Sequence, residues 1–219
     1  MISSQISSLD LILSDGIKGG TITEISGLRG TGKTQLALQF AIEPLKKNEI
    51  VYFIDTTVEF RPERFLEILE SRNFSKELLK NLHVSHVSNT QQQIEILSNI
   101  QEENFSLLII DNISDLFSFE YSEKQHFIER NNFFSNYISQ ISKIALLKNI
   151  PIIITNQILN KNGKNYRRLN NLLENYIHQK IQLEKNKNRY SGIIDSPFIN
   201  NQQFDYKITK LGIEESQSI

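Results

Sequence analysis

Eight consecutive residues restrict the possible folds of this chain more than any other segment: Gly27-Leu28-Arg29-Gly30-Thr31-Gly32-Lys33-Thr34 fits the pattern G-x-x-x-x-G-K-[ST]. The glycines allow the backbone to curl, so that several amide N–H groups point at one phosphate. A helix that begins near Lys33 adds the positive end of its dipole. Lys33 is expected to reach the β- and γ-phosphates, and the Thr34 hydroxyl to hold Mg²⁺. The loop residues predicted to bind the nucleotide are Gly27, Arg29, Gly30, Thr31, Gly32, Lys33 and Thr34.

A carboxylate is expected to reach the same metal ion from the end of a neighbouring strand. Asp111 directly follows the apolar run 107–110, which has the composition of a strand buried on both faces. An aspartate in this position, beside a phosphate-binding loop, is typical of the Walker B element of nucleotide-binding folds. A nucleoside triphosphate with Mg²⁺, held by Thr34 and Asp111, is therefore the predicted ligand.

Strand-like and helix-like segments alternate through most of the chain. Apolar runs predict strands at 21–25, 50–54, 82–87, 107–110 and 151–154. Apolar residues at helical spacing predict helices over 33–45, from Pro62, from about residue 90 and over 124–147. The stripe of the last helix includes Phe127, Phe134 and Ile138. Strands separated by helices of this length predict an α/β fold, with a mainly parallel sheet and helices on both faces.

The last third of the chain has a different pattern. Phe204, Tyr206 and Ile208 alternate with polar residues, which is typical of a strand with one face in water. Residues 177–183 partly repeat this alternation, so both segments are expected to extend the sheet with antiparallel strands. No long Pro/Gly/Ser linker divides the sequence, and its length is sufficient for one substantial core. We therefore expect a single domain over residues 1–219.

Composition excludes several classes of protein. The chain has no cysteine, so disulfide frameworks and thiolate metal sites are excluded. Its 24 Lys and Arg residues nearly balance 25 Asp and Glu residues, which argues against a surface that is basic throughout but not against a local basic patch. No apolar run approaches the ~20 residues of a membrane span, and the first residues do not have the pattern of a signal peptide. We expect a cytoplasmic protein that does not bind a membrane.

Four further segments carry a resemblance to a known family. They are Gly19-Gly20-Thr21-Ile22-Thr23-Glu24-Ile25, Phe60-Arg61-Pro62-Glu63-Arg64, Ile154-Thr155-Asn156-Gln157 and Asp195-Ser196-Pro197. In this order they resemble the RecA/RadA strand-exchange recombinases over nearly the whole chain, and more closely their shortened paralogues such as archaeal RadB. The resemblance implies a RecA-like ATPase core that binds ATP and Mg²⁺. It also implies that Arg64 packs on the adenine, that Gln157 senses the γ-phosphate, and that residues 195–197 cap the nucleotide of a neighbouring subunit.

The sequence departs from the family pattern at a position that concerns ATP hydrolysis. Members that hydrolyse ATP place a glutamate directly after the residues that match Asp55-Thr56, and this chain has Thr57 there. That glutamate is a general base for the attacking water, a role worth roughly 10²–10⁴ in rate. Glu59 would share a face with Thr57 in an extended backbone, so it either substitutes for the base or is a solvated surface carboxylate. We expect slow turnover, and at most a weak DNA-dependent ATPase. The candidate catalytic residues are Lys33, Gln157 and Glu59.

A second departure concerns assembly. Full-length members of the family carry an N-terminal domain and a linker whose aromatic residue docks on the next subunit of a filament. Neither fits in the residues before Gly19, so no long filament of this chain alone is expected. The resemblance implies instead a full-length RadA-type recombinase, or another recombination protein, as a partner.

A basic stretch follows the segment that contains Gln157. Residues 159–190 hold eight basic and two acidic residues, a net charge of about +6. Its first part, 160–165, is expected to be a polar, flexible loop, at the place where the family has a DNA-binding loop, and Tyr166 offers a face on which a base could stack. The alternative is that these lysines only keep loops solvated. The candidate residues for binding single-stranded DNA are Arg130, Lys161, Lys164, Tyr166, Arg167 and Arg168.

Three functions are compatible with these patterns. The first is an ATP-binding accessory or mediator protein of homologous recombination and DNA repair, with weak ATPase activity and single-stranded DNA binding. The second is an active ATP-dependent strand-exchange recombinase. The third is a KaiC-like signalling ATPase, which shares the loop and the sheet; the segments 60–64 and 195–197 favour the recombinase branch.

Overall fold

One mixed sheet runs through the whole protein in a computed structural model that describes residues 1–161, 164–187, 189–196 and 199–216. Its strands are β1 (Ile22–Gly27), β2 (Val51–Asp55), β3 (Leu82–His86), β4 (Leu107–Asp111), β5 (Ile152–Lys161), β6 (Lys164–Arg167), β7 (Gln179–Asn186), β8 (Arg189–Ser196), β9 (Ile199–Thr209) and β10 (Gly212–Glu215). The helices are α1 (Ser7–Ile12), α2 (Lys33–Lys46), α3 (Pro62–Ser71), α4 (Thr90–Ile100), α5 (Asp115–Glu120), α6 (Phe127–Lys148) and α7 (Asn170–Leu173). Two short 3₁₀ helices span Lys76–Asn81 and Lys124–His126.

The order of strands across the sheet is β10-β9-β8-β7-β1-β5-β4-β2-β3, and β6 pairs with the end of β5. The strands from β7 to β3 in this order are all parallel, whereas β8, β9 and β10 are antiparallel to their neighbours. The predicted α/β fold, with a mainly parallel sheet and antiparallel strands near the C-terminus, is therefore confirmed. One detail differs: residues 177–183 were expected to be antiparallel, but β7 runs parallel to β1 and antiparallel only to β8.

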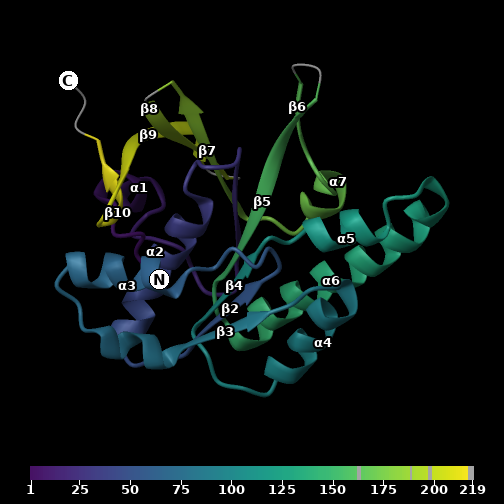
Figure 1. The fold of residues 1–219 in the computed structure, drawn as a ribbon, viewed down its shortest axis with the longest axis horizontal. Coiled ribbons are helices and arrows are strands. Elements are labelled where there is room, and N and C mark those ends of the chain that lie inside the picture. Colours follow the sequence, from purple (N-terminus) through teal and green to yellow (C-terminus); the bar gives the residue numbers. More distant parts are fainter. Residues whose placement is uncertain (162–163, 188, 197–198, 217–219) are drawn as a thin grey trace.

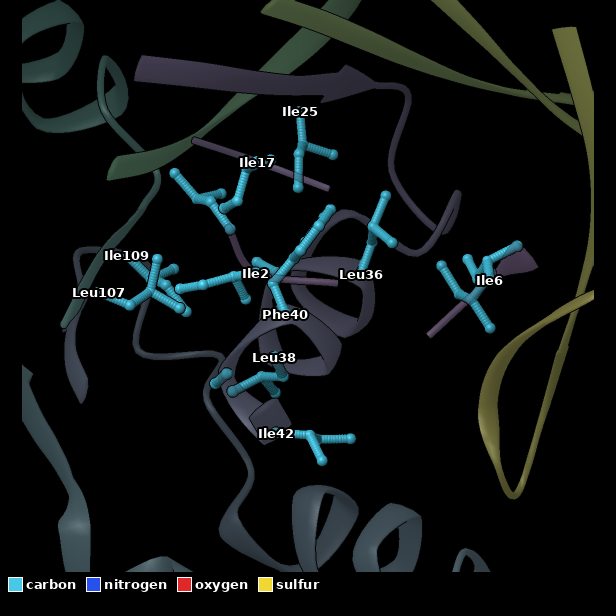
Figure 2. Close-up of a cluster of buried hydrophobic side chains, with 14 of the residues drawn as sticks. Ile2, Ile6, Ile17, Ile25, Leu36, Leu38, Phe40, Ile42, Leu107 and Ile109 are labelled. Carbon is cyan, nitrogen blue, oxygen red and sulfur yellow. The ribbon is translucent and has the colours of Figure 1, made fainter. Parts of the chain in front are cut away.

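Helices cover both faces of the sheet, so the apolar strands are buried on two sides (Figure 1). Alternate residues of one strand enter different cores: Leu107 and Ile109 of β4 pack with α2 and α3, whereas Leu108 and Ile110 pack with α4 and α6. Figure 2 shows the first of these cores, in which apolar side chains gather around Phe40 of α2.

The long helix differs from its prediction at one end. Phe134 and Ile138 are fully buried, as their spacing predicts. Phe127 was placed on the same stripe, and this is wrong: its side chain is 54% exposed. Phe127 is the first residue of α6, at the outer end of the α5–α6 pair, where the helix extends past the sheet (Figure 1). Within the described part of the chain, no helix is long and apolar enough to cross a membrane.

The parallel strands bring four loop segments to one edge. Asp55 at the end of β2 lies beside Asp111 at the end of β4, and Gly27 at the end of β1 lies beside Gln157 in β5. Ligands of open α/β sheets bind outside the carboxyl ends of the strands. The topology therefore brings the loop and the predicted metal ligand together, although they are far apart in the sequence.

Candidate nucleotide-binding site

The loop between β1 and α2 has the curled backbone that its sequence predicts. Gly30 and Gly32 lie in the left-handed region, with φ of 79° and 95°, which side chains other than glycine rarely adopt. The Thr31 hydroxyl donates to the Leu28 carbonyl over 2.8 Å, and Lys33 Nζ donates to the same carbonyl over 3.1 Å. Because α2 begins at Lys33, the free amide groups of its first turn lie beside the loop.

The C-terminal strands support this loop from the side of the sheet. The Tyr206 hydroxyl of β9 donates to the Thr31 carbonyl over 2.6 Å, and Tyr206 is buried. A side chain at Gly32 would place its Cβ only 3.1 Å from Ile208 and 3.2 Å from Ile213. The position therefore requires glycine both for its backbone angle and for the close packing of β9 and β10.

Asp111 and Thr34, the two predicted metal ligands, are in direct contact. The Thr34 hydroxyl donates to Asp111 Oδ2 over 2.5 Å, and the Thr155 hydroxyl of β5 donates to the other oxygen. Burial raises the pKa of Asp111, and these two hydrogen bonds and Lys33 oppose that shift. A hydroxyl and a carboxylate are the oxygen donors that Mg²⁺ accepts, usually together with phosphates and water. This donor set fits the predicted ion.

The loop and the strand ends surround a cavity of about 450 Å³. The predicted site residues that line it are Arg29, Gly30, Gly32, Lys33, Thr34, Glu59, Asp111 and Gln157. Gly27 and Thr31 belong to the loop but not to this lining. Burial lowers the pKa of Lys33, and the Asp111 carboxylate opposes the shift. An ammonium group, loop amides and metal ligands thus converge on one cavity, an arrangement that can hold a chain of phosphates with a metal ion.

The segment after β2 places Thr57 and Glu59 at this cavity. The Thr57 amide and hydroxyl both donate to Asp55 Oδ1 over 2.9 Å. Val58 has a φ of 57°, so the segment is turned rather than extended, yet Thr57 and Glu59 both line the cavity. The Glu59 carboxylate accepts from Arg29 over 2.7 Å and remains 58% exposed. Glu59 is therefore paired with the phosphate loop, while its role as a base stays a prediction.

Arg64, the residue expected to pack on the adenine, lies beside the cavity rather than in its lining. Its guanidinium donates to Gln35 Oε1 over 2.8 Å and to the Thr209 carbonyl over 2.5 Å, and it also pairs with Glu67. Gln35 itself lines the cavity. Arg64 is thus one side chain away from the cavity, and its contact with adenine stays a prediction. Of the expected cap, Pro197 lies outside the described residues, and Ser196 ends β8.

A buried polar network links β5 to β1 behind the loop. Gln157 lies beside Gly27 and lines the cavity. The preceding residue, Asn156, is fully buried and donates to Glu24 Oε1 over 3.1 Å. Asn156 also accepts from the Ser114 hydroxyl over 3.0 Å. The two strands that carry the loop and Gln157 are therefore joined by side chains as well as by backbone.

Glu24 is a charged residue inside the buried strand β1. It is 1% exposed, and burial raises the pKa of its carboxyl, while attraction to Arg167 opposes the shift. Arg167 Nη1 donates to Glu24 Oε2 over 2.6 Å. Arg167 belongs to β6, where it pairs with Ile158 of β5. The ion pair therefore fastens the β5–β6 hairpin to the strand that leads into the phosphate loop.

Residues 160–165 were expected to form a flexible loop, and this is wrong: the described residues of the segment form a β-hairpin. Asn160 pairs with Asn165 in the register of β5 and β6, and Lys161 pairs with Lys164. A side-chain bond from Asn160 Nδ2 to Asn165 Oδ1, 2.8 Å long, joins the two strands. Strand pairing satisfies the backbone groups of this polar segment, which periodicity alone did not indicate.

The predicted DNA-binding side chains are in different states. Tyr166 is 45% exposed, whereas Arg167 is held by Glu24 and Arg168 pairs with Asp115 over 3.1 Å. Arg130 is on α6, not on the hairpin, and its guanidinium lies 4.8 Å from the centre of the Phe127 ring. The side chains of Lys161 and Lys164 lie outside the described part of the structure.

Three residues of this site had no role in the sequence-based prediction: Glu24, Thr155 and Tyr206. The first two gave a signal, because each is a polar residue within an apolar strand, where it needs a partner. Tyr206 gave none, since an aromatic residue at period two indicates only a core position.

Comparisons with known proteins identify the family of the chain. Residues 1–216 match the family described as Rad51. The chain is 25% identical, over 243 aligned positions, to the DNA repair and recombination protein RadA of Methanococcus voltae, with 98% of this chain and 76% of that protein covered. It is 34% identical over 169 positions to RadA of Cenarchaeum symbiosum (strain A), with 72% of this chain covered. That alignment spans only 42% of the Cenarchaeum protein.

A solved structure has the same fold. The crystal structure of the RadB recombinase superposes with a TM-score of 0.83 at 24% identity, and the match covers 99% of this chain and 100% of that one. The predicted RecA-like fold is confirmed by this likeness.

Removal of Arg167 leaves the Glu24 carboxylate buried without its cation, so we expect Arg167→Ala to lower the free energy of unfolding by about 2–4 kcal/mol. Without the cation, the pKa of Glu24 rises further above that of the unfolded chain, so the folded variant keeps a proton that the unfolded chain releases. Unfolding is then favoured as pH rises, so the variant loses more of its free energy of unfolding at about pH 7.5 than at about pH 5. Urea denaturation at both pH values measures it.

Arg168→Ala is the matched control for this measurement. The pair of Arg168 with Asp115 is more exposed, at 38% and 28% for the two side chains. We expect its removal to cost less than about 1 kcal/mol. Equal losses in the two variants would contradict a special role for Arg167.

Proposed function

The chain belongs to the Rad51 family, and from this membership we propose that it is an ATP-binding recombinase paralogue that assists homologous recombination and DNA repair. The observation that carries the proposal is the contact of Thr34 with Asp111 beside a curled loop that Lys33 follows. Phosphate-binding loops of this sequence bind nucleoside triphosphates with Mg²⁺. The accessory role rests on the departure at Thr57.

ATP and Mg²⁺ fit the residues of the cavity. Lys33 and the loop amides would hold the phosphates, and Thr34 and Asp111 would hold the ion. When bound, Mg²⁺ neutralises charge on the β- and γ-phosphates. We assign the response to the γ-phosphate to Gln157, because it lines the cavity and follows the buried Asn156.

We infer slow hydrolysis from the residues at and near the position where the family has its general base. Thr57 has no carboxylate, and its hydroxyl is engaged with Asp55. Glu59 lies two residues further on, and its carboxylate is engaged by Arg29. The chain therefore binds ATP as a switch ligand more than as a substrate.

Binding of single-stranded DNA is supported by the basic stretch and by the position of the hairpin. The hairpin begins at Ile158, directly after Gln157, and carries Lys161, Lys164 and the exposed Tyr166. Arg167 is committed to Glu24, so we assign it to positioning the hairpin rather than to the phosphates of DNA. Strand β5 joins the ATP cavity directly to this surface, which gives a route by which nucleotide state changes affinity for DNA.

A full-length RadA-type recombinase is the proposed protein partner. The match to relatives named as DNA repair and recombination proteins supports it. The second candidate function is an active strand-exchange recombinase, and filaments on DNA in electron micrographs would favour it. Membership of the Rad51 family leaves no observation in favour of a KaiC-like function.

Lys33→Ala removes the ammonium group from the cavity, and we expect affinity for Mg-ATP to fall by about 10- to 100-fold. Titration with a fluorescent ATP analogue measures the loss. Lys47→Ala is the control, because Lys47 lies just after the same helix and pairs with Glu43 at the surface. Unchanged binding in Lys33→Ala, or an equal loss in Lys47→Ala, would remove the basis of the proposed switch.

Thr57→Glu returns a carboxylate to the position of the family base, and we expect the steady-state ATPase rate to rise by about tenfold or more. Phosphate release with and without single-stranded DNA measures it. The slow-ATPase hypothesis fails if the unaltered chain already turns over as fast as an active recombinase and Glu59→Gln abolishes that rate.

Neutralisation of about four phosphates predicts that log affinity for single-stranded DNA falls with log salt at a slope near −3. Lys161→Ala with Lys164→Ala removes two charges, so the slope should weaken to about −1.4. Fluorescence anisotropy with a labelled oligonucleotide at several salt concentrations measures both values. Lys76→Ala with Lys80→Ala, on the 3₁₀ helix 76–81, is the matched control and should leave the slope unchanged. A flat dependence on salt would exclude this surface.

A further inference from the structure

A second cavity, of about 360 Å³, lies beside the β5–β6 hairpin and shares no lining residue with the nucleotide cavity. Its walls come from β5, β6, α7 and β7. The volume is at the lower end of the range for ligand pockets, which is sufficient for one small planar group. Nothing in the phosphate chemistry described above uses this cavity.

Side-chain amides dominate the lining. Four of the seven lining residues are Asn165, Asn170, Asn171 and Gln182. Each amide carries one acceptor oxygen and two donor hydrogens on a planar group. No carboxylate is among the described residues that line the cavity. Such a lining suits an uncharged ligand with both donors and acceptors along its edge.

The charge of Arg167, the single cation of the lining, is already compensated. Its guanidinium donates to Glu24 Oε2 over 2.6 Å, and only 18% of its side chain is exposed. Among the described residues that line it, the cavity therefore offers no unpaired positive charge for a phosphate. This separates it from the nucleotide cavity, where Lys33 has no comparable ion pair among the described contacts and faces the phosphate site.

The remaining walls are apolar or aromatic. Ile158 is an apolar lining residue and is 6% exposed, whereas the lining residue Tyr166 is 45% exposed. Aromatic side chains exposed in this way stack with nucleobases, and the interaction tolerates any base because every base has a π-face.

One amide of the lining lacks a partner. Asn170 donates through Nδ2 to Glu174 Oε1 over 2.9 Å, but its buried Oδ1 accepts no hydrogen bond from the described residues. A buried acceptor without a donor is unfavourable, so a rotation of the Asn170 amide that brings Oδ1 to an N–H group of a ligand in the cavity would remove this cost. All four DNA bases carry such a group on the edge that pairs in a duplex.

We propose that this pocket binds one unstacked nucleobase of a single-stranded DNA, with the Tyr166 ring on its face and the amides of α7 and β7 along its edge. The inference rests on the proposed binding of single-stranded DNA and adds a base-contacting subsite to it. Phosphates on either side of the base would then lie along the basic hairpin.

An oligonucleotide without bases distinguishes binding of a base in the pocket from binding of the DNA through its phosphates alone. Fluorescence anisotropy compares an end-labelled mixed-sequence strand with an abasic strand of equal length at the same salt concentration. Both carry the same phosphates, so contact with phosphates alone gives equal affinities. A base in the pocket gives tighter binding of the intact strand, by about tenfold. Equal affinity for the two strands overturns the proposal and leaves phosphate binding intact.

Two pairs of variants test whether the tighter binding of the intact strand depends on the pocket. Tyr166→Ser should remove most of the preference for the intact strand, and Tyr166→Phe should keep it, because the ring is retained. Asn171→Asp introduces a charge without a change of size; the charge repels the phosphates of both strands, but the loss of the amide should weaken the intact strand more and so reduce the preference for it. Asn201→Asp makes the same change at an exposed position of β9 outside the pocket and should have no effect. A preference that survives both Tyr166→Ser and Asn171→Asp contradicts the assignment.

Free deoxynucleosides test the pocket without any phosphate. In NMR spectra of the folded chain saturated with Mg-ATP, millimolar deoxycytidine should shift the side-chain amide signals of Asn171 and Gln182. If neither the intact nor the abasic strand binds, the DNA part of the proposed function fails. The nucleoside titration then decides on the pocket separately: shifted amide signals keep it as a nucleobase site, and unshifted signals remove it.

Discussion

A single buried carboxylate ties together the parts of this protein that form the nucleotide cavity. Asp111 ends β4 and accepts hydrogen bonds from Thr34 at the start of α2 and from Thr155 in β5. Burial raises the pKa of Asp111, and these two hydroxyls oppose that shift. One side chain thus links the start of α2 to two neighbouring strands, β4 and β5.

The hairpin beside the cavity is attached in a second way. Glu24 lies in the strand that leads into the phosphate loop, and it accepts from Asn156 of β5 and from Arg167 of β6. A buried ion pair of this kind contributes less to stability than to the choice of one arrangement. Here the arrangement is the place of the hairpin relative to the loop, so Glu24 connects the two surfaces that we assign to ATP and to DNA.

Local patterns predicted the cavity better than its surroundings. The loop and the Asp111 strand follow from short motifs, since chain connectivity brings each motif residue to its neighbours. The Glu24–Arg167 pair joins residues 143 positions apart and depends on the order of β1, β5 and β6, which periodicity does not encode. The prediction that Phe127 is buried was wrong for a related reason. Helical spacing indicates which face of a helix is apolar, but not how far along the helix the partner sheet extends.

The phosphate loop also depends on the far end of the chain. Tyr206 donates to the carbonyl of Thr31, and Ile208 and Ile213 fill the space beneath Gly32. During synthesis the glycine-rich segment leaves the ribosome before its supporting strands β9 and β10. A nascent chain therefore acquires the fully supported loop only after residue 213 has been synthesised and β9 and β10 can pack against Gly32.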